Sequence, residues 1–497
     1  MLDSLFTAAE YLSQGVNLVY LVLGVAVGIV FGSIPGLGGA TAIALLLPLT
    51  FGMEPEQAVI LMGGIMGAVS IGGSVSAILM NTPGTAPNAA TCIDGYPLTR
   101  QGKAGLAIGA AATASSIGGI ISLAILVVLL PVAKTIVLWF GPPAFFMLAV
   151  LGLTSLTVAS GNLLRGLVAA CVGLFFGFVG YDDIGGTARY TLDIDFLWDG
   201  ISIVPLLIGL FAIAEMMNLY RTGGPISAGD DGDNVKVVGT MDGVRSVFAN
   251  PRTLFSGSAI GTIIGMIPGV GGTVASFLAY SFAAQTSKDN EKFGSGDIRG
   301  VIAPEAANNA KDGGALIPTL AFGIPGSAEM AIFLGVLILH GIDPGPMLLI
   351  ERESTIFMLI LALLCATLLS GGIILIAARH LARIAHIDSM LLIPCVITVS
   401  LVGAYALHGD IGDVFVAAFF GVLGFVMIRF DYPRITLVIA FVLSGLMERN
   451  FIQSMIMFEG NWQLFFADRT TLILFLLTLC ALLIPAASFI RSRRSVR

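Results

Sequence analysis

The feature that most constrains this chain is an apolar helix that ends in a Pro-Gly-x-Gly-Gly break, because the sequence contains it twice. Residues Gly32–Gly39 read GSIPGLGG, and residues Gly265–Gly272 read GMIPGVGG. The repeat extends upstream at one constant offset (257 − 24 = 233), which pairs the following glycines: Gly24, Gly28 and Gly32 with Gly257, Gly261 and Gly265. Helices broken at corresponding positions of two halves indicate a transporter site near the middle of the membrane.

Composition supports the membrane setting. Of the 497 residues, 56% are hydrophobic and only 11% are charged, whereas soluble domains carry about 25% charged residues. Many stretches reach the roughly 20 apolar residues that one crossing requires. The alternation typical of barrel strands is absent. We therefore expect an all-α polytopic membrane protein with about 10–14 transmembrane helices, some of them broken or re-entrant.

Charge and cysteine content exclude other classes of protein. The formal net charge of −7 argues against nucleic acid as a partner. The five cysteines are scattered, and no pair has metal-ligand spacing. We expect no metal and no cofactor, apart from Na⁺ or H⁺ as a transported coupling ion. The N-terminal residues 1–15 lack a basic region, so a cleavable signal peptide is not expected.

Each half also contains a second break. Residues 81–88 read NTPGTAPN, and residues 323–327 read GIPGS. Pro83-Gly84 recurs as Pro325-Gly326 (325 − 83 = 242), preceded by a Gly-Gly pair in both halves (313 − 72 = 241). Two landmarks that repeat in the same order make a chance match much less plausible than one.

These landmarks predict the organisation of the chain. We expect a first membrane repeat over 1–220 with breaks at 35–39 and 81–88, a flexible cytoplasmic linker over 221–253, a second repeat over 254–490 with breaks at 268–272 and 323–327, and a basic cytoplasmic tail over 491–497. Lys and Arg place the linker and the tail in the cytoplasm, while the first 99 residues contain neither. The two repeats would then enter the membrane from opposite sides, as inverted repeats do.

Three segments are expected to differ from a single straight membrane span. Residues 40–51 are apolar but short, which suits a re-entrant or half helix. Residues 104–139 are too long for one straight span, and Gly118-Gly119 or Pro131 are expected to split or kink it. Residues 315–322 are expected to form a short helix after the polar stretch 304–314.

Broken helices can bind ions because they free backbone groups that lipid cannot satisfy. Exposed helix N-termini suit a carboxylate, and free carbonyl groups suit a cation. The predicted substrate-binding residues are Pro35, Gly36, Gly38, Gly39, Asn81, Thr82, Pro268, Gly269, Gly271, Gly272 and Ser327. The predicted cation-binding residues are Asn308, Asn309, Gly84 and Gly326. The two roles can be exchanged between the sets.

Each motif also has an ordinary interpretation. Pro-Gly turns join spans at the membrane surface, and glycines spaced by four serve helix packing. Asp182-Asp183 fits either a Mg²⁺-diphosphate site or a loop. Glu305 and Glu329 fit either an intramembrane function or the membrane interface, and Asp94 either a turn or a coupling group. The four histidines, His340, His380, His386 and His408, form no ligand cluster.

Several longer motifs occur together in order along the chain. They are Ile34–Gly39, Gly72–Pro97 with its NTPG and DGYP segments, Ile267–Gly272, Ala303–Ala310 (APEAANNA), Gly323–Ser327 and His340–Pro346 (HGIDPGP). In these motifs the chain resembles the large membrane subunit of the tripartite tricarboxylate transporters, the TctA family. The resemblance covers nearly the whole sequence. It departs from the family pattern at Tyr181–Tyr190, where Gly185-Gly186 is unusual.

The resemblance implies a three-component carrier of the bacterial inner membrane. A periplasmic solute-binding protein delivers a small di- or tricarboxylate, a small membrane subunit accompanies this multi-pass subunit, and a cation gradient drives symport. No P-loop motif is present, in agreement with an ion-driven process. The alternatives are a passive anion channel and an intramembrane enzyme. An intramembrane enzyme would need an HExxH motif or a clear Ser/His pair, and the sequence contains neither.

Overall fold

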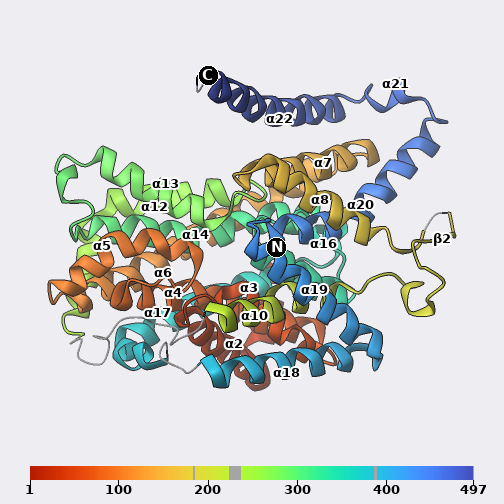
Figure 1. Cartoon of the computed structure of the whole chain (residues 1–497). Helices are drawn as coiled ribbons and strands as arrows, with labels where there is room; N and C mark the ends of the chain where they lie inside the picture. Colours follow the sequence, from red (N-terminus) through yellow and green to blue (C-terminus); the bar gives the residue numbers. More distant parts are fainter. Residues whose placement is uncertain (183–184, 223–236, 385–388, 496–497) are drawn as a thin grey trace.

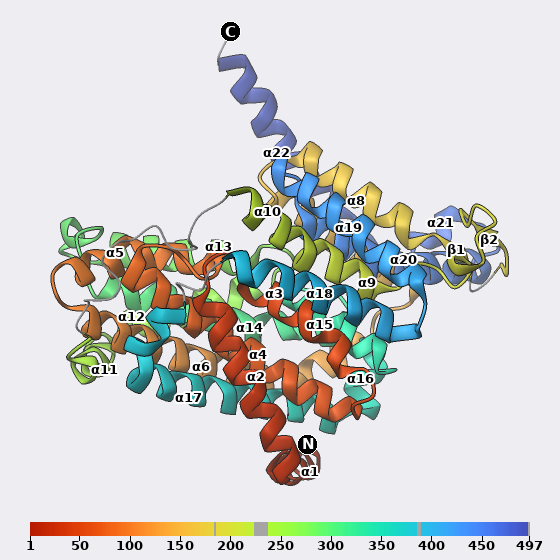
Figure 2. The same cartoon turned by 60° about the horizontal axis from the view of Figure 1, so that its bottom comes forward.

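The computed structural model describes residues 1–182, 185–222, 237–384 and 389–495. Over these residues the regular structure is helical, apart from a short antiparallel pair between β1 (Gly180–Tyr181) and β2 (Ala188–Arg189), and turns and loops join the elements. In Figure 2 the first helix, α1 (Leu2–Ser13), and the last, α22 (Arg469–Ser495), leave the body on opposite sides. The expected all-α fold is confirmed for the described residues.

The elements before the charged central segment are shown from red to green in Figure 1. They are α1, α2 (Gly15–Ser33), α3 (Gly38–Leu46), η1 (Leu47–Thr50), α4 (Pro55–Met80), η2 (Ala86–Asn88), α5 (Ala89–Arg100), α6 (Ala104–Val137), α7 (Pro142–Ala159), α8 (Leu163–Gly177), β1, β2, η3 (Asp195–Leu197), α9 (Ile203–Leu207), the π-helical turn η4 (Ile208–Ile213) and α10 (Ala214–Thr222).

The elements after it continue from green to blue. They are α11 (Thr240–Ala249), α12 (Pro251–Gly265), α13 (Gly271–Thr286), η6 (Asn290–Lys292), α14 (Arg299–Phe322), α15 (Ala328–Leu339), α16 (Pro346–Glu351), α17 (Glu353–Ile384), α18 (Ser389–His408), α19 (Ile411–Arg429), α20 (Arg434–Met457), α21 (Trp462–Phe465) and α22.

Within the described ranges, eight helical segments are long and apolar enough to cross a membrane, which makes this a multi-pass membrane protein. They are Gly15–Ser33, Pro55–Met80, Ala104–Val137, Pro142–Ala159, Ile203–Thr222, Glu353–Ala378, Ile411–Arg429 and Arg434–Met457. Five shorter apolar segments accompany them: Gly38–Thr50, Leu163–Gly177, Ala328–Leu339, Leu392–His408 and Arg469–Leu483. The expected number of about 10–14 transmembrane helices stays a prediction.

Local structure differs from the sequence expectation in three places. Helix α6 runs without a break through Gly118, Gly119 and Pro131. Helix α14 is one helix of 24 residues, where a polar stretch followed by a short helix was expected. Helix α11 lies inside the expected linker range and packs on α6, so that segment is ordered. Residues 223–236 of the linker and His386 lie outside the described residues.

Two helices form the centre of the molecule. The most apolar window of α4 is buried along its whole length, and nearly all of α14 from Gly300 to Ala321 is buried as well. Helix α4 packs against α2 and α17, whereas α14 packs against α12 and α6. Each central helix therefore has one partner close to it in sequence and one from the other half of the chain.

The glycines spaced by four create the first kind of contact. A β-carbon on Gly24, Gly28 or Gly32 would overlap the carbonyl oxygens of Leu61, Ile65 and Val69 on α4. In α12, Gly257, Gly261 and Gly265 face the carbonyl oxygens of Ala303, Ala307 and Lys311 on α14 in the same way. Small residues thus let each helix pair approach backbone to backbone, as the packing interpretation of this spacing requires.

Candidate functional site

The two Pro-Gly-x-Gly-Gly segments have the same backbone shape. Gly36 and Gly38 have φ of +87° and +63°, and their counterparts Gly269 and Gly271 have φ of +79° and +74°. Glycine adopts these left-handed backbone conformations without strain because it has no β-carbon. Each segment turns the chain from one helix directly into the next, α2 into α3 and α12 into α13.

The second breaks also have features in common. Helix α4 ends at Asn81 (φ +54°) and α14 ends at Gly323 (φ +68°), both in the left-handed conformation that closes a helix. Beyond these ends, Gly84 lies against the carbonyl oxygen of Gly32, and Gly326 lies against that of Gly265. The second break of each half is therefore packed on the last glycine of the first helix in that half.

The structure also brings the first break of each half to the second break of the other. Helix α3 contacts α15, and α13 contacts η2. At the first junction a β-carbon on Gly39 would lie 3.4 Å from Glu329 Oε1. At the second, Gly272 faces the aliphatic stem of Lys311 and the ring of Pro87.

Not every predicted residue takes part. Asn81 is exposed, and the Thr82 hydroxyl donates to the Met80 carbonyl at 3.2 Å. Ser327 caps α15 by accepting a hydrogen bond from the Met330 amide at 3.3 Å. Among the described residues, none of these three side chains hydrogen-bonds another predicted site residue.

A stripe of buried polar residues runs along α14 near these junctions. Glu305, Asn308, Asn309 and Asp312 lie three or four residues apart and share one helical face. Their exposed fractions are 0%, 1%, 3% and 6%. Buried polar side chains are uncommon in helices of this kind and often mark ion or substrate pathways.

The Glu305 carboxylate is held by three uncharged donors from the first half of the chain. Ser74 Oγ of α4 lies 2.6 Å from Oε2. Thr91 Oγ1 of α5 and Asn88 Nδ2 of η2 lie 2.5 Å and 3.1 Å from Oε1. No Lys or Arg of the described residues forms an ion pair with it. Glu305 is fully buried in the protein, and half-buried Glu329 is the less buried of the two acids.

Asn308 and Asn309 differ sharply from their neighbours. The side-chain oxygen and nitrogen of both residues are buried and make no hydrogen bond to any described residue. Asn309 Nδ2 faces Gly119 of α6, where a β-carbon would lie 3.2 Å away. Leaving a buried polar group unpaired costs about 1–3 kcal/mol. Such a cost is typical of a binding site and unusual for simple packing.

A buried ion pair completes the stripe. Lys311 Nζ lies 2.5 Å from Asp312 Oδ1, and both side chains are less than a tenth exposed. Both groups also interact electrostatically with Glu329. Lys311 is the one Lys or Arg among the described residues whose side chain is buried. It places a positive charge beside Gly272 of the second Pro-Gly break.

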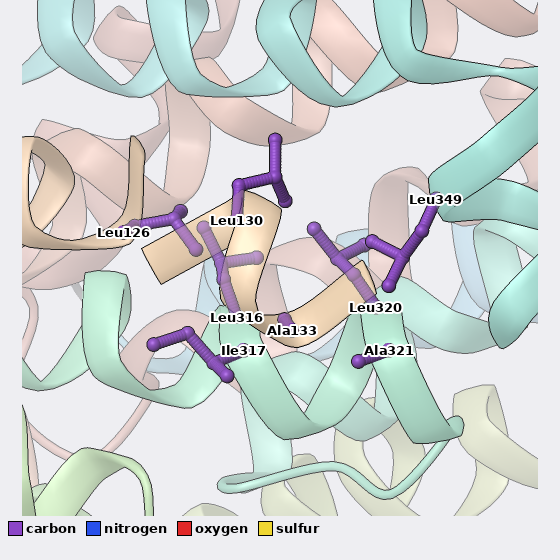
Figure 3. A pocket seen from close by; sticks show the side chains of 8 residues that line it. All are labelled: Leu126, Leu130, Ala133, Leu316, Ile317, Leu320, Ala321 and Leu349. Atoms are coloured by element: carbon purple, nitrogen blue, oxygen red, sulfur yellow. The ribbon is translucent and has the colours of Figure 1, made fainter. Parts of the chain in front are cut away.

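A separate apolar pocket lies farther along α14, between α6 and α16 (Figure 3). It is lined by Leu126, Leu130, Ala133, Leu316, Ile317, Leu320, Ala321 and Leu349. None of these side chains can bind a carboxylate or a cation. The chemistry of the site therefore belongs to the polar stripe and the breaks, and not to this pocket.

Sequence reasoning missed Ser74, Thr91, Lys311 and Asp312 as site residues, and it included Asn88 only as a polar residue of the break at 81–88. Isolated hydroxyl groups in apolar helices give no local signal, because their meeting with Glu305 depends on how α4 and α5 pack on α14. The Lys311-Asp312 pair did offer a signal, since a Lys-Asp dipeptide next to Gly313-Gly314 in a buried helix is expensive unless it has a role.

Comparison with known proteins identifies similar sequences. Residues 18–439 match the family model described as the tripartite tricarboxylate transporter TctA family. An uncharacterized 52.8 kDa protein in the TAR-I ttuC' 3'region of Agrobacterium vitis is 33% identical over 496 residues, which cover 99% of this chain and 98% of that protein. An uncharacterized protein in the TAR-II ttuC' 3'region of the same organism is 32% identical over 47% of this chain and 97% of its own length. No solved structure matches the chain.

Proposed function

The chain belongs to the tripartite tricarboxylate transporter TctA family, and from this premise we propose that it takes up small carboxylates by secondary active transport. As the large membrane subunit of such a system, it is a transporter and not an enzyme. In the proposed system a periplasmic solute-binding protein delivers a di- or tricarboxylate, a small membrane subunit accompanies this one in the bacterial inner membrane, and a cation gradient drives uptake.

We further propose that the two halves, 1–220 and 254–490, are inverted repeats with re-entrant segments at their breaks. Three observations support this. The paired glycines of the breaks share their left-handed conformations. The glycine faces of α2 and α12 contact α4 and α14 in the same way. Each central helix also packs against a helix from the other half, α4 against α17 and α14 against α6. Transporters built from such repeats bind substrate where the repeats meet.

The proposed substrate site lies between the four breaks. The observation that carries it is the pair of buried, unpartnered amides of Asn308 and Asn309 on α14, the helix that contacts both halves. The Pro35–Gly39 and Pro268–Gly272 segments supply backbone amides for a carboxylate, and Lys311 adds a positive charge. For the cation, the proposal retains the carbonyl groups of Gly84 and Gly326 together with the two asparagine amides.

Uptake by proteoliposomes tests the proposal. Both membrane subunits are reconstituted, the binding protein is added outside, and labelled mono-, di- and tricarboxylates are offered under an imposed Na⁺ or proton gradient. We expect saturable accumulation against a concentration gradient that stops when the ion gradient is collapsed. Uptake that only equilibrates, and that ignores both gradients, would instead identify the passive anion channel.

A further inference from the structure

We infer that the Glu305 carboxylate is the binding site of the coupling cation, a proton or Na⁺, with the Ser74 and Thr91 hydroxyls as its surrounding ligands and Asn88 as a donor that positions the carboxylate. The inference rests on the proposed function, because a coupling cation exists only if transport is coupled. It extends that proposal by moving the cation from the asparagine amides and break carbonyls to a carboxylate supported from the other half of the chain.

The surroundings of Glu305 are a built site. Besides its bond to Glu305, the Asn88 amide nitrogen donates to the Ser70 carbonyl at 3.2 Å. The Asn88 oxygen in turn accepts from the Thr85 hydroxyl. The cluster therefore offers both carboxylate oxygens, the Ser74 and Thr91 hydroxyls and the Ser70 carbonyl within one buried space, while the Asn88 amide nitrogen orients the carboxylate. Oxygen atoms of these kinds are the ligands that hard cations prefer.

The charge around Glu305 leaves room for a cation. Among the described titratable groups on the helices packed against α14, the Cys92 thiol of α5 interacts electrostatically with this carboxylate. Asp94 on the same helix is bound to the backbone of residues 294–297. Lys311 and Asp312 lie about two turns farther along α14 and pair with each other. A buried carboxylate without a positive partner is costly, and a bound monovalent cation removes that cost.

A second observation points to a ligand in the same place. Asn308 follows Glu305 by three residues, which puts the two side chains side by side on the helix surface. Its amide is 1% exposed and has no hydrogen-bond partner among the described residues. The unpaired amide of Asn308 continues the oxygen-rich cluster toward the breaks, so occupation of Glu305 is coupled to the proposed substrate site by direct proximity.

The donors are also of a kind that can respond to a cation. Ser74 and Thr91 hold the carboxylate with rotatable hydroxyls, each of which has lone pairs as well as a proton. When the carboxylate is free, the hydroxyls donate to it. When Na⁺ is bound, they can turn and present oxygen to the ion. When a proton is bound, one hydroxyl can accept from the new O–H group.

The main test uses Glu305→Gln in proteoliposomes with both membrane subunits and the binding protein. We expect the variant to lose gradient-driven accumulation by at least about tenfold, the effect of about 1.4 kcal/mol of coupling. Carboxylate exchange between equal internal and external pools, which needs no net cation movement, should fall by less than accumulation does. A variant that accumulates carboxylate like the parent protein overturns the inference.

Thr91→Val distinguishes the two cations and keeps the test valid if Glu305→Gln does not fold. Loss of a hydrogen bond to a charged group corresponds to roughly tenfold in affinity. Removing this donor makes a proton bind more tightly, so half-saturation of uptake moves up by about one pH unit. Removing an oxygen ligand makes Na⁺ bind more weakly, so the half-saturating Na⁺ concentration rises about tenfold.

Thr99→Val is the matched control. Thr99 is a buried threonine of the same helix α5, and its hydroxyl donates to the Ile78 carbonyl at 2.8 Å and not to Glu305. We expect this control to leave both cation dependences unchanged. If Thr91→Val also leaves both unchanged, the inference is overturned. If the parent protein itself shows neither exchange nor coupled uptake of any carboxylate tested, the proposed function fails independently of Glu305.

Discussion

Two buried carboxylates on neighbouring elements, Asp94 and Glu305, are held in opposite ways. Oδ1 of Asp94 accepts hydrogen bonds from the backbone amides of Gly294, Gly296 and Asp297 at 2.9, 2.7 and 2.9 Å. Its Oδ2 accepts one from the Tyr280 hydroxyl at 2.9 Å. Among the described residues, Glu305 has only side-chain donors, two of which are hydroxyl groups that can rotate.

The difference separates a fixed contact from an exchangeable site. Backbone amides in a turn cannot reorient, so Asp94 ties α5 permanently to the loop before α14. The sequence left Asp94 open between a turn residue and a coupling group, and its partners favour a structural role. At Glu305 the donors can change partner without moving the backbone, and two unpaired amides lie close along the same helix face. We therefore expect Asp94 to contribute mainly to stability and Glu305 mainly to cation binding.

The largest effect on stability is expected from Asp94→Asn. The substitution removes the charge and can turn an amide donor toward three backbone N–H groups, so we expect a loss of about 3 kcal/mol in unfolding free energy. Thermal unfolding in detergent measures it. The matched variant Glu305→Gln should lose clearly less unfolding free energy than Asp94→Asn. Equal losses would contradict the different roles assigned to the two carboxylates.

The next effect concerns the unpaired amides. Asn308→Leu replaces a buried polar group without partners by an apolar one of similar size, so we expect unfolding free energy to rise by about 1 kcal/mol while transport falls at least tenfold. The control is Asn450→Leu, since the Asn450 amide donates to the Leu446 carbonyl at 2.8 Å. A destabilised Asn308→Leu variant would show that this amide serves packing.

Gly296→Ala tests the loop side of the Asp94 contact. Gly296 has φ of +107°, a conformation that costs other residues about 1–3 kcal/mol. We expect faster amide hydrogen exchange at residues 294–297 and a lower unfolding temperature, with the cation dependence of uptake unchanged. Gly102→Ala is a control for positive φ in a loop, because Gly102 (φ +75°) has no hydrogen bond to Asp94. If Gly296→Ala altered the cation dependence of uptake and Gly102→Ala did not, Asp94 and Glu305 would have to act together in transport.

Tyr280→Phe is the milder change at the same contact. It removes the Tyr280 hydroxyl, the one side-chain donor to Asp94 among the described residues, and leaves the three backbone donors, so we expect a loss of about 1 kcal/mol in unfolding free energy. The unfolding temperature of this variant should lie between those of the parent protein and Asp94→Asn. A loss as large as that of Asp94→Asn would contradict the dominance of the backbone donors.

The smallest effect concerns acid stability of the same loop. Burial alone would raise the pKa of Asp297, but hydrogen bonds and charge from Arg299 outweigh burial and hold this pKa below its usual range. The stabilising contribution is therefore present above the ordinary pKa of Asp and is lost as the pH falls through the lowered value. Arg299→Gln should move the acid unfolding midpoint to higher pH. An unchanged midpoint would show that the pair contributes nothing to acid stability.

The glycine breaks were accessible from sequence because their cause is local. Pro35–Gly39 and Pro268–Gly272 need φ values that glycine adopts readily, so the pattern itself reports the turn. Helix α14 was not accessible in the same way. Its prolines and its Glu, Lys and Asp residues are typical of a loop, and only burial among α4, α5, α6 and α12 explains why it continues as one helix.

The candidate site residues also differ in whether the sequence alone could reveal them. Asn308 and Asn309 were predicted as site residues because amides add neutral donors and acceptors near the breaks, and the structure leaves their side chains without hydrogen-bond partners among the described residues. Ser74, Asn88 and Thr91 converge on Glu305 from elements more than 200 residues away in sequence. No periodicity or composition records such a contact, because it depends on the tertiary packing of two halves of the chain.

The packing of each central helix on a helix from the other half of the chain has a consequence for biogenesis. Helix α4 is complete at Met80, but its partner α17 begins at Glu353 (353 − 80 = 273). At about 5–20 residues per second, synthesis of the intervening chain lasts roughly 15–55 s. During that time the glycine-rich surface of α4 that later receives α17 has only lipid or chaperones to cover it. Nascent chains truncated before α17 should therefore be degraded by membrane proteases much faster than the complete protein.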